Sequence, residues 1–155
     1  MRRARASVEV PGPVSEAETL WYDLDRWPAW IDGFATVLRR ESGWPEGGGL
    51  LVWQSKPNGR GRVLERVLGY EPRTGQESEV EDEQLDGRQR ISFRPQGEKV
   101  VVELVLEYDL KREGPLLFVT DLLFIRRALR DSLRRTLQRY ARERRGDAEL
   151  ALEAK

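Results

Sequence analysis

The stretch Asp23-Leu24-Asp25-Arg26-Trp27-Pro28-Ala29-Trp30 decides how this chain folds. Residues 15–27 form an amphipathic segment with apolar side chains three and four positions apart, which predicts a helix. Pro28 ends that helix, because proline cannot donate a backbone hydrogen bond and it biases the preceding residue away from helical geometry. Only strand-like segments follow until a long amphipathic helix near the C-terminus. This order predicts a scaffold built around an internal apolar cavity.

The segments that follow read as strands because they alternate or carry β-favouring residues and are separated by Gly, Pro, Asn and Asp. A short helical turn is expected at 30–34. Asp86-Gly87 is expected to form a hairpin turn. The short turns between successive strands predict an antiparallel meander. The expected strands are 6–10, 36–41, 50–55, 62–70, 76–84, 88–94 and 99–111.

The two faces of these strands differ in polarity. Strand 99–111 places only apolar and aromatic side chains on one face, namely Val100, Val102, Leu104, Leu106, Tyr108 and Leu110. This pattern is typical of a sheet with one buried and one wet face. Strand 76–84 is different, because glutamates alternate there with mostly polar residues. We favour a charged edge strand, which resists aggregation; the alternative is that Asp82 or Gln84 points into a polar end of the interior.

The final helix is expected over 116–145, about 45 Å at 1.5 Å per residue. One face carries an apolar stripe and the other is rich in arginine. A solvated surface is the simplest interpretation of the arginines. The alternatives are peripheral contact with an anionic membrane through Arg126, Arg130 and Arg134, or pairing with the glutamates of a second copy in a homodimer.

Composition limits the chemistry. Among 155 residues there is no cysteine and no histidine, which excludes thiolate and imidazole catalysis and Cys/His metal sites. We therefore expect no metal and no other cofactor.

Lys plus Arg and Asp plus Glu each number 27, so no global field favours nucleic acid as a partner. No apolar run reaches the length of a membrane span, and the basic N-terminus lacks the apolar core of a signal peptide, so we expect a cytoplasmic protein.

Three places in the chain resemble one known family. They are Asp23 to Trp30, the glycine-rich Gly47-Gly48-Gly49, and Gly114-Pro115-Leu116 before the last helix. Over about residues 4–145 the chain resembles the SRPBCC (START-like) superfamily, and within it the bacterial polyketide cyclase/dehydrase and lipid-transport group. The resemblance implies an α+β helix-grip fold, with a curved antiparallel sheet of about seven strands wrapped around the long C-terminal helix. It also implies a single domain over 1–145, to which we add a flexible charged tail at 146–155.

The function that follows is binding of a hydrophobic small molecule, such as a lipid, quinone or polyketide-like aromatic, by a carrier or binding module. The main alternative is a metal-free cyclase/dehydratase in which Asp82, Tyr70 or Tyr108 moves protons and Arg66 forms a buried ion pair with Asp82. A third is a membrane- or partner-binding protein.

Trp27 and Trp30 are expected to close one end of the cavity; ligand stacking is the alternative. Candidate cavity residues, each also suited to an ordinary core, are Trp53, Ile91, Phe93, Val102, Leu104, Leu106, Leu122, Ile125 and Leu129.

Overall fold

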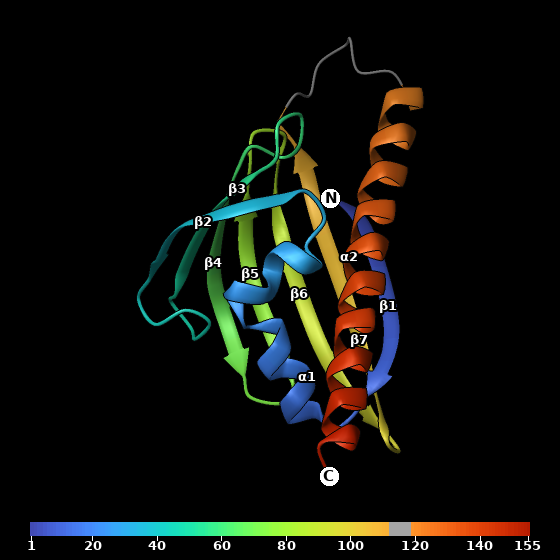
Figure 1. The fold of residues 1–155 in the computed structure, drawn as a ribbon. Coiled ribbons are helices and arrows are strands. Elements are labelled where there is room, and N and C mark those ends of the chain that lie inside the picture. The colour runs from blue at the N-terminus through green and yellow to red at the C-terminus, as the bar shows by residue number, and fades with distance from the viewer. Residues whose placement is uncertain (112–118) are drawn as a thin grey trace.

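The structure is a computed structural model that describes residues 1–111 and 119–155 (Figure 1). The expected Gly114-Pro115-Leu116 approach to the last helix, and the predicted helix start at 116, lie outside the described residues. The helices are α1 (Val14–Trp21), the 3-10 helix η1 (Leu24–Ala29) and α2 (Val119–Glu153). The strands are β1 (Arg2–Pro11), β2 (Phe34–Glu41), β3 (Leu50–Ser55), β4 (Arg62–Glu71), β5 (Gly75–Glu81), β6 (Leu85–Gln96) and β7 (Lys99–Leu110).

All seven strands form one antiparallel sheet in the order β1-β7-β6-β5-β4-β3-β2. The sheet is curved, and Figure 1 shows α1, η1 and α2 on the same side of it. The predicted α+β helix-grip architecture is therefore confirmed. The apolar face of β7 is also as predicted, because all six of its alternating members are buried beneath the helices.

Several local predictions are wrong. The first helix does not continue to Pro28, because α1 ends at Trp21 and Pro28 lies inside η1. The second helical segment is η1 and not 30–34, since the Asp23 side chain accepts a hydrogen bond from the Asp25 amide at 3.2 Å and begins the turn earlier. Asp86-Gly87 is not a hairpin turn, because both residues lie inside β6. β5 is not an edge strand. It is the central strand of the sheet, and Glu77 pairs outward with Arg90 of β6 at 3.3 Å.

The last helix is longer than predicted. It continues past Gly146 to Glu153, so the expected end near residue 145 is wrong. Contacts with η1 support the helix across its predicted end, because Arg26 forms ion pairs with Glu143 at 2.9 Å and Asp147 at 3.0 Å. The side chain of Asp147 is thus held against the domain, within the segment expected to be a free tail.

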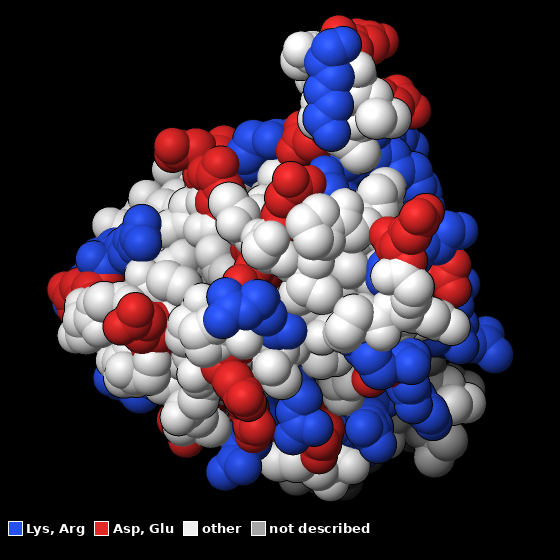
Figure 2. All heavy atoms as spheres, turned by 90° about the horizontal axis from the view of Figure 1, so that it is seen from below, with Lys and Arg blue, Asp and Glu red and all other residues white. Residues whose placement is uncertain are grey.

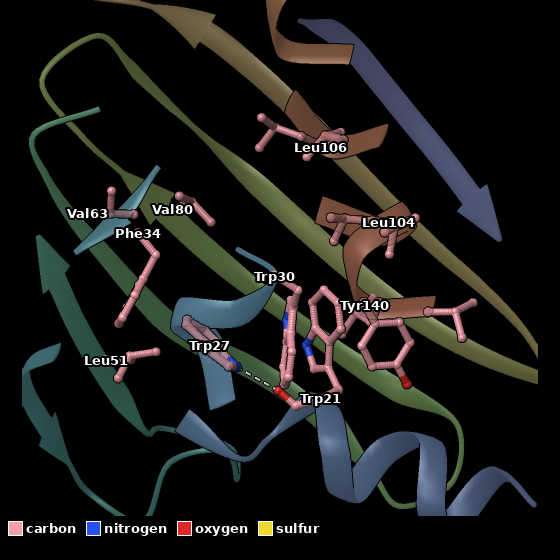
Figure 3. Close-up of a cluster of buried hydrophobic side chains, with 14 of the residues drawn as sticks. Trp21, Trp27, Trp30, Phe34, Leu51, Val63, Val80, Leu104, Leu106 and Tyr140 are labelled. Atoms are coloured by element: carbon pink, nitrogen blue, oxygen red, sulfur yellow. Dashed lines mark hydrogen bonds between the residues drawn. The ribbon is translucent and has the colours of Figure 1, made fainter. Parts of the chain in front are cut away.

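The lower half of the core is packed with aromatic rings (Figure 3). Trp30 is fully buried and meets Tyr140 of α2 edge to face, with ring centroids 5.6 Å apart. Trp27 donates its indole N–H to the Trp21 carbonyl at 2.7 Å. Both tryptophans therefore pack against the protein's own side chains, and their closing of a cavity stays a prediction.

Polar contacts fix the same half of α2. Asp32, in the turn after η1, accepts hydrogen bonds from Ser132 at 2.7 Å, Arg135 at 2.9 Å and Arg139 at 3.2 Å. Burial alone would raise the pKa of the Asp32 carboxyl, but Arg135 leads the contacts that hold it below its ordinary value. Buried Arg144 bonds the carbonyls of β1 and its following turn and pairs with Glu16 at 2.7 Å. These contacts pin α2 across one end of the sheet.

Candidate functional site

Asp82 is buried, but in a turn and not beside Arg66. Its carboxylate accepts hydrogen bonds from the amides of Gln84 at 2.7 Å and Leu85 at 2.9 Å, which closes the turn between β5 and β6. Its ion-pair partner is Arg60, at 2.7 Å. Arg66 is exposed on the outer face of the sheet, opposite Glu79. The proposed Arg66–Asp82 pair is therefore wrong, because the odd-numbered positions of β4 face inward before its bulge.

The two candidate tyrosines lie in different parts of the interior. A bulge between Val67 and Gly69 turns Tyr70 toward α1, where its ring meets that of Tyr22 with centroids 5.5 Å apart. Burial, reinforced by Glu18 and Glu46, raises the pKa of Tyr70. Tyr108 is fully buried on the concave face of β7. Its hydroxyl has no hydrogen-bond partner among the described residues, and burial raises its pKa.

The functional group that the sequence analysis missed is Glu65. It is only 6% exposed and points into the concave face from β4. Trp53 donates its indole N–H to one carboxyl oxygen at 2.7 Å, and Gln89 donates its amide to the other at 3.4 Å. Burial raises the pKa of Glu65 above its ordinary 4.5, and the Trp53 hydrogen bond and the charge of Arg60 offset this only in part. The environment therefore disfavours the charged carboxylate relative to that of an exposed glutamate.

A signal for Glu65 was present in the sequence. It lies between Val63 and Val67, two positions away from each, so a strand that buries both valines must bury Glu65 as well. The arginines at the even positions drew attention to the other face. The direction of Trp53 follows from the same alternation: it is buried on the concave face, with its ring centroid 5.5 Å from that of Phe34.

Glu65 and Tyr108 lie at the two ends of one row across the sheet. Glu65 is opposite Val80, Val80 is opposite Gly87, and Gly87 is opposite Tyr108. Three strand spacings separate the ends, roughly 14 Å in a flat sheet, and the curvature brings the side chains closer. The side chains in the middle of the row extend little above the sheet, because Val80 is small and Gly87 has no side chain. A Cβ on Gly87 would lie 2.1 Å from the Glu107 carbonyl oxygen, so glycine is required there.

The predicted cavity residues of the sheet extend from this row along β6 and β7. Ile91, Phe93, Val102, Leu104 and Leu106 are buried on the concave face. Leu122, Ile125 and Leu129 of α2 are only half-buried and pack against the same core. Figure 3 shows Leu104 and Leu106 on the sheet, with Trp21, Trp30 and Tyr140 grouped toward one end. Contact of these residues with a ligand stays a prediction.

The buried carboxyl predicts a distinctive pH dependence of stability. A carboxyl whose pKa is raised by folding destabilises the folded state as pH rises from the unfolded pKa, near 4.5, through the folded pKa. Glu65→Gln has no such group, so its stability relative to the wild type should be lowest below pH 4.5 and should improve as the pH rises over that range. Urea unfolding from acid to neutral pH measures the difference. A constant difference, as expected for the exposed control Glu98→Gln, would contradict the burial of a titrating group at residue 65.

Comparisons with solved structures agree with this architecture. A protein from Thermus thermophilus, TTHA0849, matches 95% of this chain and 99% of its own at 20% identity, with a TM-score of 0.73. The di-domain ARO/CYC StfQ from the steffimycin biosynthetic pathway matches 95% of this chain at 19% identity, with a TM-score of 0.74, and this chain spans 51% of StfQ. XoxI from Bacillus cereus matches 93% of this chain and 96% of its own at 13% identity, with a TM-score of 0.70. These likenesses establish the fold.

At the level of sequence, no curated protein matches significantly. No helix in the described part of the chain is long and apolar enough to cross a membrane. The family model described as polyketide cyclase/dehydrase and lipid transport matches residues 1–144. With nearly the whole length matched and the helix-grip fold in place, the chain belongs to the polyketide cyclase/dehydrase and lipid transport family.

Proposed function

We propose that the protein binds a hydrophobic small molecule, such as a lipid, a quinone or a polyketide-like aromatic, between the sheet and α2. It would act as a carrier or binding module in the cytoplasm, without a cofactor. The observation that carries the proposal is the buried Glu65 carboxyl on an otherwise largely apolar concave face. Both hydrogen-bond partners of this carboxyl, Trp53 and Gln89, are donors, so a proton on Glu65 has no acceptor in these two contacts. A buried donor without an acceptor is costly to a fold, and a ligand oxygen that accepts the proton offsets that cost.

The arrangement favours a ligand with an apolar body and a polar end. In its protonated form Glu65 can donate a hydrogen bond to a carbonyl oxygen, and the Tyr108 hydroxyl offers a second donor or acceptor across the row. Trp53 and Phe34 supply an aromatic wall beside Glu65. The half-buried leucines and isoleucine of α2 would cover the apolar body. Few polar anchors within an apolar lining are typical of small-molecule sites.

Val80→Phe tests whether the middle of the row is hollow. Val80 lies between Glu65 and Gly87, so a larger ring there would occupy the space assigned to the ligand. We expect the variant to fold with nearly wild-type stability and to lose at least about tenfold in affinity. In a closely packed interior the same change would cost about 1–3 kcal/mol instead.

Delipidated protein is the sample for this test. Tryptophan fluorescence titration and native mass spectrometry would be run with a fatty acid, a quinone and an aromatic polyketide, alongside thermal unfolding. Val101→Phe, the same change on the outer face of β7, is the control and should bind normally. Failure of all three ligand classes to form a one-to-one complex would reject the proposed function, as would binding by Val80→Phe at the wild-type level.

A cyclase/dehydratase is the second candidate function, and one observation favours it. A carboxylic acid whose pKa is raised by burial can act as a general acid toward a carbonyl or a leaving hydroxyl. Glu65→Gln separates the two functions, because the amide keeps the shape and hydrogen-bonding capacity but cannot supply the proton. A carrier should retain ligand binding with this change, whereas an enzyme should retain binding and lose turnover.

A further inference from the structure

Five arginines converge on a groove between β1 and the first turns of α2. The groove, of about 230 Å³, is lined by Ala4 and Leu123 together with the arginines, which are Arg3, Arg5, Arg126, Arg127 and Arg130. We call this feature the arginine groove. A second hollow continues from it along Met1, Leu122 and Leu123. None of the described residues that line the two hollows is acidic.

The arginine groove has little internal charge compensation. Arg5 pairs with Glu103, and Arg130 approaches its neighbour Asp131 at 3.7 Å. Arg3, Arg126 and Arg127 have no ion pair within the described part of the chain. The chain as a whole is neutral, with 27 residues of each sign, so this concentration is local. The face of the molecule seen from below carries charges of both signs: Figure 2 shows acidic and basic side chains interspersed there.

Exposed apolar side chains accompany the arginines. Phe124 is 73% exposed and Leu123 is 49% exposed, and Met1, 73% exposed, lines the continuing hollow. These are three of the seven large apolar side chains that are exposed in the described chain. Isolated exposed apolar residues are ordinary, whereas a cluster of them beside a strongly basic groove marks a candidate interaction surface.

We propose that the arginine groove and Phe124 dock the protein on an anionic phospholipid bilayer. Basic side chains gather at anionic headgroups, while an aromatic ring and leucine on the same helical turns enter the headgroup–acyl boundary. Arg3 and Arg127 come from different elements, so the surface exists only when β1 and α2 are folded together. This inference goes beyond small-molecule binding, and it concerns the outward side of the same helical turns whose Leu122 and Ile125 face the core.

Vesicle co-sedimentation of the full chain tests the proposal without any interior ligand. We expect binding to vesicles of phosphatidylcholine mixed with phosphatidylserine, little binding to phosphatidylcholine alone, and loss of binding at about 0.5 M salt, where charges are screened within about 4 Å. Arg3→Ala/Arg127→Ala should weaken binding roughly 25-fold, about fivefold for each arginine. Phe124→Ala should weaken binding to the same vesicles while leaving its salt dependence unchanged.

The matched control is Arg62→Ala/Arg94→Ala, which removes two exposed arginines from the sheet and the same net charge. It should bind like the wild type. Equal weakening by both double variants, or equal binding to the two vesicle compositions, would overturn the proposal. Binding to duplex DNA but not to vesicles, or a dimer that Phe124→Ala dissociates without any vesicle binding, would do the same. Titration of the same variants with small-molecule ligands in solution is a separate measurement. Failure of vesicle binding is therefore distinguishable from failure of the proposed function.

Discussion

Trp30→Ala should lower the free energy of unfolding by about 3–5 kcal/mol, the range for deleting a fully buried tryptophan. Trp30 is 0% exposed and its ring packs edge to face on Tyr140, so the truncation leaves a cavity between η1 and α2. Its indole N–H has no hydrogen-bond partner among the described residues, so the loss is one of packing and not of a polar contact. Urea or thermal unfolding measures the change.

The control for this change is Leu38→Ala. Leu38 is 44% exposed on β2, and we expect a change within about 0.5 kcal/mol. Because a typical domain is stable by only about 5–15 kcal/mol, Trp30→Ala should leave the protein folded but close to its limit at warm temperatures. A loss below about 1 kcal/mol would show that the aromatic end of the interior is loosely packed, contrary to the structure.

Asp82→Ala should cost about 3 kcal/mol of stability, because breaking one side of a buried ion pair leaves the other charge uncompensated. The Arg60 side chain is 24% exposed, which moderates the cost. The substitution also removes the acceptor for the amides of Gln84 and Leu85, so the turn between β5 and β6 loses its internal support. At temperatures where the variant is folded, ligand affinity should be unchanged. This outcome distinguishes a turn-forming carboxylate from the proton-moving role considered from the sequence.

Two substitutions complete that experiment. Asp86→Ala removes a carboxylate whose side chain is 61% exposed, and it should be nearly neutral. Asp82→Asn keeps an acceptor for the turn while it removes the charge, so it should fall between Asp82→Ala and the wild type. If Asp82→Asn abolished turnover of a substrate without loss of stability, the structural role assigned to Asp82 would be wrong.

The architecture was predictable because its signals are repeated along the chain. Glycine and proline separate the strands, and β7 carries a regular apolar face. The helix break was predicted in the right part of the chain but at the wrong residue, because α1 ends at Trp21 and Pro28 lies inside η1. Agreement among independent local signals is what specifies a fold. The errors in element boundaries arise where a side chain competes with the backbone pattern. Asp82 forms the turn that Asp86-Gly87 was expected to form, and contacts with Arg26 support the last helix past Gly146.

The candidate site was harder to predict, because it depends on the phase of one strand. In β4 each face carries both apolar and charged residues, so the strand alone does not show which face lies inward. The neighbouring strands decide, since Val63, Glu65 and Val67 face the same side as the apolar row of β7. The bulge after Val67 then reverses the phase for Tyr70. A single sequence shows neither the pairing register nor the bulge, so Glu65 was missed and Arg66 was misplaced.

The two ends of α2 are attached to the rest of the domain to different degrees. Among the side chains that the structure describes, the polar contacts that tie α2 to the rest of the domain begin at Ser132 and continue to Asp147, while residues 122–131 contribute side chains that are half-buried or exposed. Substitutions in that first third should therefore be tolerated by the fold far more readily than those in the remainder. Evolution could thus alter what the protein accommodates and what it touches by changing three turns of one helix, without having to reinvent the scaffold that holds them.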